Sequence, residues 1–227
     1  MIRENLNKVE EKIAKICQKC GRKRSEITLI GVSKTQSIEI IKDALVAGLK
    51  DLGENKAHEL KEKSELISGD FNWHFIGHLQ TNKVKYIISH ADYIHSVDSI
   101  KLADEINRKA AQIGKTQNVL LEIKTSSEAT KHGLQTEKEI LELSDYCFQS
   151  PNLKLVGLMT MAPYTDNFEL IRKCFVRLRQ TKEFLYKSGF ELKELSMGMT
   201  NDFEIAIEEG ATMLRIGTAI FGERIKA

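Results

Sequence analysis

The chain has 227 residues, of which 41% are hydrophobic, and its 34 lysines and arginines nearly balance its 32 acidic residues. A chain of this size buries roughly 70–75% of its extended surface on folding, so a large core is expected. The net charge of +2 creates no global field that would attract nucleic acid or an anionic membrane, and neither is expected as a partner.

The first residues, MIRENLNKVEEK, are too charged for a secretory signal, and no apolar stretch approaches the ~20 residues of a membrane span. We therefore expect a cytoplasmic protein. Among the four cysteines, Cys17 and Cys20 form a C-x-x-C pair on a helical pattern that begins at Leu6. Because no second pair follows, we expect both to pack on the buried face of that helix and to bind no metal.

Short β-rich segments alternate with longer helical patterns along the rest of the chain. Helices are predicted at Ile38–Ala47, capped by Ser37, and at Phe168–Lys187. Capping boxes are predicted from Thr136 with Glu139 and from Asn201 with Glu204. The strands are predicted at Thr28–Val32, Leu49–Gly53, Trp73–Ile76, Tyr93–Ser96, Val119–Ile123, Leu155–Met159, Glu194–Met197 and Met213–Ile216.

Eight β-to-α steps after one leading helix predict an α/β fold, a single-domain (β/α)8 TIM barrel with an extra N-terminal helix. No Pro-rich or Gly/Ser-rich linker divides the chain, so residues 1–227 are expected to form one domain. The alternative is a doubly wound open sheet. A nucleotide-binding sheet of that kind more often has a G-x-G-x-x-G turn after its first strand, and residues 31–34 read GVSK.

Lys34 directly follows the first predicted strand, in the segment ITLIGVSKT. One interpretation is a solvated residue that ends a buried strand. In a (β/α)8 barrel, however, the carboxyl ends of the strands form the active-site face, which places Lys34 at the mouth. A partly desolvated mouth disfavours the charged lysine and frees an amine that can form a Schiff base with a carbonyl compound.

The ends of the last two predicted strands carry residues that favour anion binding. Barrels often hold phosphate there, and the segments LSMGMTND and LRIGTAIFGER combine hydroxyl side chains with glycines that let backbone N–H groups approach an anion. The candidates are Ser196, Gly198, Gly217 and Thr218. Strand alternation places Arg215 and Gly217 together on the inward face of the barrel.

Several segments together resemble a known family. They are VSKT at 32–35, LGEN at 52–55, HFIGHLQTNK at 74–83, IHSVDS at 94–99, KHGL at 131–134, GLMTM at 157–161, LSMGMTND at 195–202 and RIGTAIFGER at 215–224. In this order they resemble, over nearly the full chain, the YggS/PROSC family of pyridoxal 5'-phosphate (PLP) homeostasis proteins. The chain departs from that pattern at Gln36-Ser37, where many relatives have a basic residue and a proline.

The resemblance implies that Lys34 holds PLP as a Schiff base and that Ser196, Gly217 and Thr218 help to hold its phosphate. It also implies a fold like the barrel domain of alanine racemase, where an arginine and a glycine spaced like Arg215 and Gly217 meet the pyridine nitrogen and the phosphate. Two interpretations of Asn55 stay open. It either caps the helix after the second strand or lies beside the cofactor, as the resemblance implies.

These implications favour intracellular PLP homeostasis, meaning cofactor buffering and delivery to apo-enzymes, by a monomer without strong catalytic activity. A guanidinium only donates hydrogen bonds, so Arg215 facing the ring nitrogen would keep that nitrogen unprotonated and weaken the ring as an electron sink. The barrel uses up the chain and leaves no residues for the second domain that helps to complete the site in racemase relatives, so the cofactor face should be open.

Two other functions are retained. The first is a small PLP-dependent amino-acid racemase that uses Tyr164, His78 or Lys131 near the mouth as its base. The second is an aldolase-like lyase that uses Lys34 on a sugar phosphate, which predicts a colourless protein.

Histidines and aromatic residues near the third strand have simpler interpretations. His74 and His78 are separated by Gly77 and a strand end, so they share no helical face and no metal site is expected. His74 is expected to pack near the mouth, and Trp73 and Phe75, which alternate with it, are expected to pack the barrel.

Overall fold

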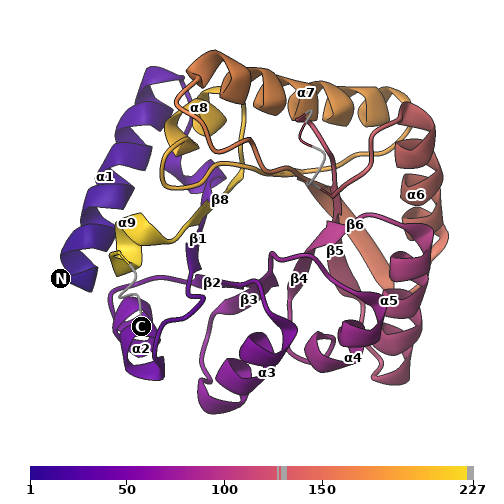
Figure 1. The fold of residues 1–227 in the computed structure, drawn as a ribbon, viewed down its shortest axis with the longest axis horizontal. Helices are drawn as coiled ribbons and strands as arrows, with labels where there is room; N and C mark the ends of the chain where they lie inside the picture. Colours follow the sequence, from indigo (N-terminus) through magenta and orange to yellow (C-terminus); the bar gives the residue numbers. More distant parts are fainter. Residues whose placement is uncertain (127, 129–131, 224–227) are drawn as a thin grey trace.

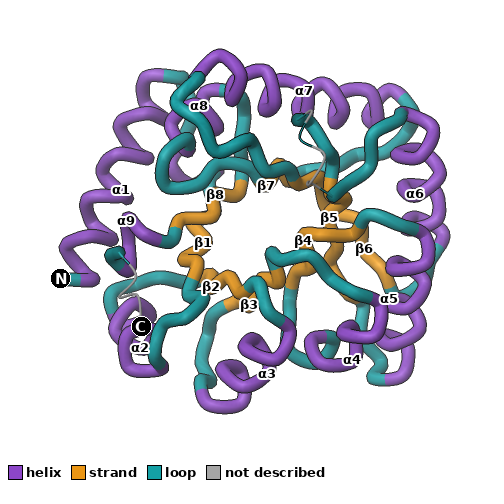
Figure 2. The backbone as a smooth tube through the Cα atoms, viewed as in Figure 1, coloured by secondary structure: helices purple, strands orange, loops and turns teal. Residues whose placement is uncertain are grey.

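The structure, a computed structural model, describes residues 1–126, 128 and 132–223. Its strands form a closed parallel barrel in chain order, in which the last strand pairs with the first. Figure 1 shows the strands around a common centre, and Figure 2 shows the helices as an outer ring around them. The prediction of a (β/α)8 barrel is confirmed, and the alternative of an open sheet is wrong.

The strands agree closely with the predicted segments. The first and the last strand have the predicted bounds, and each of the other strands differs from its prediction by one or two residues at one end or both. They are β1 (Thr28–Val32), β2 (Asp51–Glu54), β3 (Asn72–Phe75), β4 (Tyr93–Val97), β5 (Gln117–Glu122), β6 (Leu153–Met159), β7 (Glu194–Ser196) and β8 (Met213–Ile216).

Helices cover the outside of the barrel. They are α1 (Ile2–Lys19), α2 (Ile38–Val46), α3 (Ala57–Leu66), α4 (Val84–Ile87), α5 (Ile100–Gln112), α6 (Glu137–Gln149), α7 (Phe168–Lys187), α8 (Phe203–Glu208) and α9 (Thr218–Phe221), with 3₁₀ turns at Arg24–Glu26 and Thr81–Lys83. The extra helix α1 packs against α2, α8 and α9 (Figure 1). It thereby completes the outer ring of helices where the first and last β/α units meet. None of the helices in the described ranges combines the length and the apolar character needed to cross a membrane.

Two of the predicted helix starts are confirmed. The Ser37 hydroxyl accepts a hydrogen bond from the Ile40 N–H, and Thr136 and Glu139 form the expected capping box before α6. The capping box predicted from Asn201 is wrong. Helix α8 begins after Asp202, whose carboxylate turns back to accept from the Met199 N–H at 2.5 Å.

The prediction for Cys20 is also wrong. Cys17 is buried on the inner face of α1, but Cys20 is exposed because it is the C-cap residue, where the chain turns away at Gly21 with a φ of 68°. The helical period that holds for Leu6 to Ile16 therefore ends before it reaches position 20.

Apolar side chains form two buried clusters. The larger one lies between the sheet and the helices and includes Trp73 and Phe75, which confirms their predicted packing role. The smaller one fills part of the barrel interior with Ile30, Leu120, Met159 and Met213. The rest of the interior is polar, because His74, His95, Ser196 and Arg215 are all buried there.

Candidate functional site

The predicted site residues lie at the carboxyl ends of four strands that are neighbours in the closed barrel, in the order β7, β8, β1, β2. Ser196 ends β7, while Gly217 and Thr218 follow β8 directly. Lys34 is two residues beyond β1, and Asn55 is one residue beyond β2. Barrel closure between β8 and β1 is what brings residues 34 and 217 to one side of the mouth, although they are far apart in sequence.

Arg215 and Ser196 form the centre of this arrangement. One guanidinium nitrogen of Arg215, Nη1, donates to Ser196 Oγ at 2.6 Å, and the other, Nη2, donates to the carbonyl of Thr160 at 2.8 Å. The inward orientation predicted for Arg215 agrees with its burial, since 4% of the residue is exposed. Burial lowers the pKa of Arg215 to about 10, which still leaves the guanidinium charged at neutral pH.

A hydrogen-bond chain continues from Ser196 through the barrel interior. Ser196 Oγ contacts His95 Nδ1, His95 Nε2 contacts His74 Nδ1, and His74 Nε2 contacts Asp51 Oδ1, each at 2.9 Å. His74 also stacks on Tyr93, with ring centroids 4.6 Å apart. We call Asp51, His74, His95, Ser196 and Arg215 the interior hydrogen-bond chain. Its members come from five different strands.

The two ends of the interior hydrogen-bond chain fix the direction of every link. A guanidinium can only donate and an ionised carboxylate can only accept. With both imidazoles neutral, each must carry its proton on Nε2, and the Ser196 hydroxyl donates to His95 while it accepts from Arg215. Burial lowers the pKa of His95 well below its ordinary value, and the charge of Arg215 adds to the effect, which favours a neutral His95 imidazole.

His74 packs in the buried interior, one residue before the end of β3, and its two ring nitrogens connect Asp51 to His95. The sequence pattern could indicate an inward residue at this position, but it could not indicate a polar partner on the neighbouring strand.

The turn after β8 offers unpaired backbone donors. Among the described residues, no carbonyl accepts from the N–H groups of Gly217 and Thr218, although the Gly217 carbonyl accepts from Ile220 and Phe221 of α9. A Cβ on Gly217 would lie 3.5 Å from Val32 Cβ, an ordinary contact, so the surrounding protein does not require a glycine there. The glycine leaves this part of the turn without a side chain.

Gly198, which the sequence also marks as an anion-binding candidate, has a packing role. Its φ is +94°, and a Cβ there would lie 2.6 Å from Ala206 Cβ on α8. Its carbonyl accepts from the Arg215 N–H at 2.9 Å. The glycine thus lets the end of β7 pass close to α8 and β8.

The loop that carries Lys34 is strained. Thr35, the next residue, has a φ of 66°, a left-handed conformation that is costly for a β-branched residue. Its N–H donates to Glu59 Oε1 on α3 at 2.5 Å. Strain of this kind persists only where the surroundings hold the backbone in place.

Lys63 on α3 supplies that support. Its Nζ donates to the Ser33 carbonyl at 2.7 Å, to Glu54 Oε1 at 2.8 Å and to Glu59 Oε1 at 2.7 Å. The Ser33 hydroxyl also donates to Glu54 Oε1, at 2.6 Å. We call Ser33, Glu54, Glu59 and Lys63 the Lys63 network. It is nearly closed to solvent, because Glu54 has no exposed surface and the Lys63 side chain is 8% exposed.

The two carboxylates of the Lys63 network differ electrostatically. Burial raises the pKa of Glu54, against the opposing hydrogen bonds from Lys63 and Ser33. Burial also acts to raise the pKa of Glu59, but hydrogen bonds from Lys63 and from the Thr35 N–H outweigh it and lower the pKa. The network therefore joins the residues on both sides of Lys34 to α3. The i,i+4 spacing of Glu59 and Lys63 on the helix is the one signal of this network in the sequence.

Asn55 does not cap α3. The N-cap is Lys56, and the described residues provide no hydrogen-bond partner for the Asn55 side chain. The backbone of Asn55 is tightly covered, since a Cβ on Gly77 would lie 2.2 Å from its carbonyl oxygen. The side chain borders a cavity of about 860 Å³ between α3 and the loops after β1, β2 and β3. Of the two interpretations of Asn55, the helix cap is wrong.

Two of the residues considered as catalytic bases lie in different loops of the part of the chain that the structure describes. Tyr164 is 92% exposed in the loop after β6. His78 lies in the loop after β3, and Lys131 falls outside the described residues. The sequence did not indicate Glu122, which lies buried at the end of β5. Burial and the charge of Asp98 raise the pKa of Glu122 to about 7, and the charge of Arg215 acts in the opposite direction.

Comparison with known proteins agrees with this geometry. The family model for the alanine racemase N-terminal domain matches residues 5–225. A pyridoxal phosphate homeostasis protein of Aquifex aeolicus is 45% identical over 97% of this chain and 97% of its own length. Another of the same name, from Escherichia coli K12, is 39% identical over 98% of this chain and 97% of its own.

Solved structures give the same result. PipY of Synechococcus elongatus, solved with PLP bound, superposes with a TM-score of 0.84 and 31% identity over 98% of this chain and all of its own. An alanine racemase of Clostridium difficile shares the fold, with a TM-score of 0.78 at 18% identity, and this chain covers 57% of it. The matches extend over the barrel and its mouth alike, and the chain belongs to the pyridoxal phosphate homeostasis proteins, a family with the fold of the alanine racemase N-terminal domain.

Proposed function

We propose that this chain binds PLP and acts in its intracellular homeostasis, as a buffer and donor of the cofactor, without strong catalytic activity. The proposed binding residues are Lys34, Asn55, Ser196, Arg215, Gly217 and Thr218. The observation that carries the proposal is the grouping of an amine, a buried guanidinium paired with a hydroxyl, and unpaired backbone N–H groups on adjacent strands.

The donor set fits the cofactor. A phosphate accepts hydrogen bonds, and the turn after β8 offers the N–H groups of Gly217 and Thr218 together with the Thr218 hydroxyl. When bound, PLP supplies an aldehyde that a lysine amine can hold covalently. Lys34 is the amine proposed for that role, and the Lys63 network keeps the loop that carries it in place.

Two features favour binding over catalysis. Every polar hydrogen of Arg215 is a donor, so a ring nitrogen that faces it must be unprotonated, which supports carbanion chemistry poorly. Tyr164, one of the bases considered for a racemase, is almost fully exposed, so little of the surrounding protein holds its ring in place. A positioned acid or base is a requirement of racemisation.

The cellular setting forms part of the proposal. All four cysteines are free thiols, which fits the reducing cytoplasm. We propose that residues 1–227 act as one unit and as a monomer, and that apo-enzymes receive the cofactor. Light scattering should return a mass near 25.8 kDa.

The test is the visible absorption spectrum and the cofactor content of the purified protein. We expect a yellow protein that borohydride bleaches, and we expect Lys34→Ala to lose the visible band. Lys56→Ala is the matched control, because Lys56 is an exposed lysine at the same end of the barrel. A Lys34→Ala protein with the full visible band would refute the role of Lys34.

The racemase alternative needs its own assay. The protein is incubated with a panel of L-amino acids, and the appearance of D-isomers is followed by chiral chromatography. We expect no stereochemical turnover at enzymatic rates, which are typically 1–10³ s⁻¹. Turnover in that range would show that the protein is an enzyme.

A further inference from the structure

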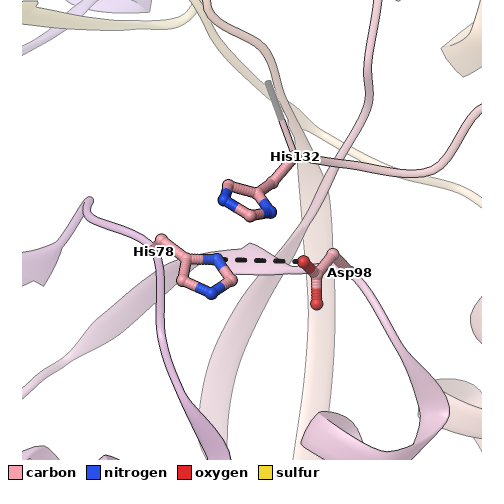
Figure 3. Close-up of side chains that lie close together, drawn as sticks. All are labelled: His78, Asp98 and His132. Carbon is pink, nitrogen blue, oxygen red and sulfur yellow. Dashed lines mark ion pairs between the residues drawn. The ribbon is translucent and has the colours of Figure 1, made fainter. Parts of the chain in front are cut away.

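Three side chains from neighbouring loops gather at the mouth of the barrel, after strands β3, β4 and β5. His78 comes from the loop after β3, Asp98 from the loop after β4 and His132 from the loop after β5. Figure 3 shows the two imidazoles above and beside the carboxylate. Because β3, β4 and β5 are adjacent in the barrel, the closed sheet brings these loops together.

The distances within this group suit a cation better than direct contact. One nitrogen from each imidazole and one oxygen from Asp98 lie within 4.8 Å of one another. His78 Nδ1 and Asp98 Oδ2 are 4.0 Å apart, too far for a hydrogen bond. The rings of His78 and His132 stack with centroids 4.0 Å apart and an interplanar angle of 18°. Three potential ligand atoms therefore surround one point without satisfying each other.

We propose that His78, Asp98 and His132 bind a divalent transition-metal ion of the zinc class. Two imidazoles and one carboxylate form a ligand set that suits Zn²⁺, whereas Ca²⁺ and Mg²⁺ prefer oxygen ligands only. Three protein ligands leave at least one coordination position for water or a substrate group.

The geometry requires a small closing movement. Zinc bonds of about 2.0–2.1 Å in a tetrahedral site place ligand atoms about 3.3 Å apart, so the three side chains must approach by ~1 Å. His78 and His132 are exposed and lie on loops, which leaves their side chains room to rotate. The site is thus completed by the ion rather than fully formed in advance.

The local charge also favours a cation. In the part of the chain that the structure describes, no lysine or arginine forms an ion pair with Asp98, and the basic side chain beside it is His78, at 4.0 Å. The buried Oε2 atom of Glu122, at the end of β5, has no hydrogen-bond partner among the described residues.

The test uses the purified full chain, stripped with EDTA and desalted. Zn²⁺ is titrated by calorimetry, and Co²⁺ is followed through its d–d absorption bands, which report tetrahedral coordination. We expect one ion per chain, and we expect His78→Ala, Asp98→Asn and His132→Ala each to weaken binding more than about tenfold. The control is His90→Ala, a histidine in the loop between α4 and β4 that lies outside the group.

The outcomes separate this site from the cofactor site. Binding that survives in Lys34→Ala, with the far-UV circular dichroism of all variants unchanged, supports the proposal. Zinc affinity that is unchanged in all three ligand variants overturns it. Binding that vanishes in Lys34→Ala and survives in the three ligand variants also overturns it, because the cofactor would then be the ligand.

Discussion

The substitution Lys63→Met should strongly destabilise the protein and loosen the loop that carries Lys34. Lys63 Nζ donates to Glu54, to Glu59 and to the Ser33 carbonyl. Methionine has a similar length but no charge, so Glu54 would keep a fully buried carboxylate without its cation. Removing one partner of a buried ion pair costs about 3–5 kcal/mol.

The measurements are urea unfolding, which gives the free energy of unfolding, and thermal melting, which gives Tm, both followed by far-UV circular dichroism. For a chain of this size, each kcal/mol lowers Tm by ~2–4 °C, so Lys63→Met should melt ~6–20 °C below the wild type. Lys61→Met is the matched control. Lys61 lies on the same helix, but its ion pair with Glu65 is solvent-exposed at 3.7 Å, and the loss should be no more than about 1 kcal/mol.

A double-mutant cycle isolates the charge effect. Glu54→Gln removes the buried negative charge, so Lys63→Met with Glu54→Gln should lose less stability than the sum of the single substitutions. The fraction of PLP retained after dialysis should fall in Lys63→Met and stay near wild type in Lys61→Met. Equal stability losses in the two lysine variants, or strict additivity in the double variant, would refute this account of the Lys63 network.

Three further predictions concern backbone strain, packing and pH. Thr35→Gly should raise the free energy of unfolding by up to about 1 kcal/mol, because relief of the left-handed conformation at φ 66° outweighs the entropic cost of glycine. A lower free energy of unfolding, measured with urea, would contradict the strain at this residue. Gly198→Ala should lower the free energy of unfolding by about 2–5 kcal/mol, because of its positive φ and the 2.6 Å approach to Ala206. Gly210→Ala, with a φ of +93° and no close contact, should lower it by only about 1–2 kcal/mol. Equal losses of stability in the two variants would exclude the packing effect at Gly198. His95 has a lowered pKa, so below its ordinary value of about 6.5 the unfolded chain takes up a proton that the folded chain does not, and wild-type stability falls as the pH falls. His95→Gln lacks this effect, so the stability gap between wild type and variant should narrow from pH 8 to pH 5, and a gap that widens would contradict the buried neutral imidazole.

Most of the fold was predictable because its signals are local. Strands β1 and β8 and helix α7 have their predicted bounds, since apolar alternation and helical period persist over each whole segment. Predictions failed where a single residue at an element end decides the outcome. Cys20 lies where α1 ends. The N-cap of α8 shifts from Asn201 to Asp202, whose carboxylate accepts a hydrogen bond from the preceding Met199 N–H.

The candidate site was predictable in its positions and not in its partners. Lys34 and Gly217 follow strands, and the barrel rule places strand ends at the mouth. One hydrogen-bond partner of Ser196, in contrast, is His95, which is 101 residues away in the chain, and no sequence periodicity connects the two.

The sequence by itself determined the barrel, the inward face of each strand and the set of residues at the mouth. These properties depend on repeats of two and about 3.6 residues, which are written into each segment separately. Only the tertiary structure decided that Lys63 supports the Lys34 loop, that Asp51 connects through two imidazoles to Ser196, and that His78 meets His132. Those contacts join different strands and loops, so they depend on the register and closure of the whole sheet, which no single segment encodes.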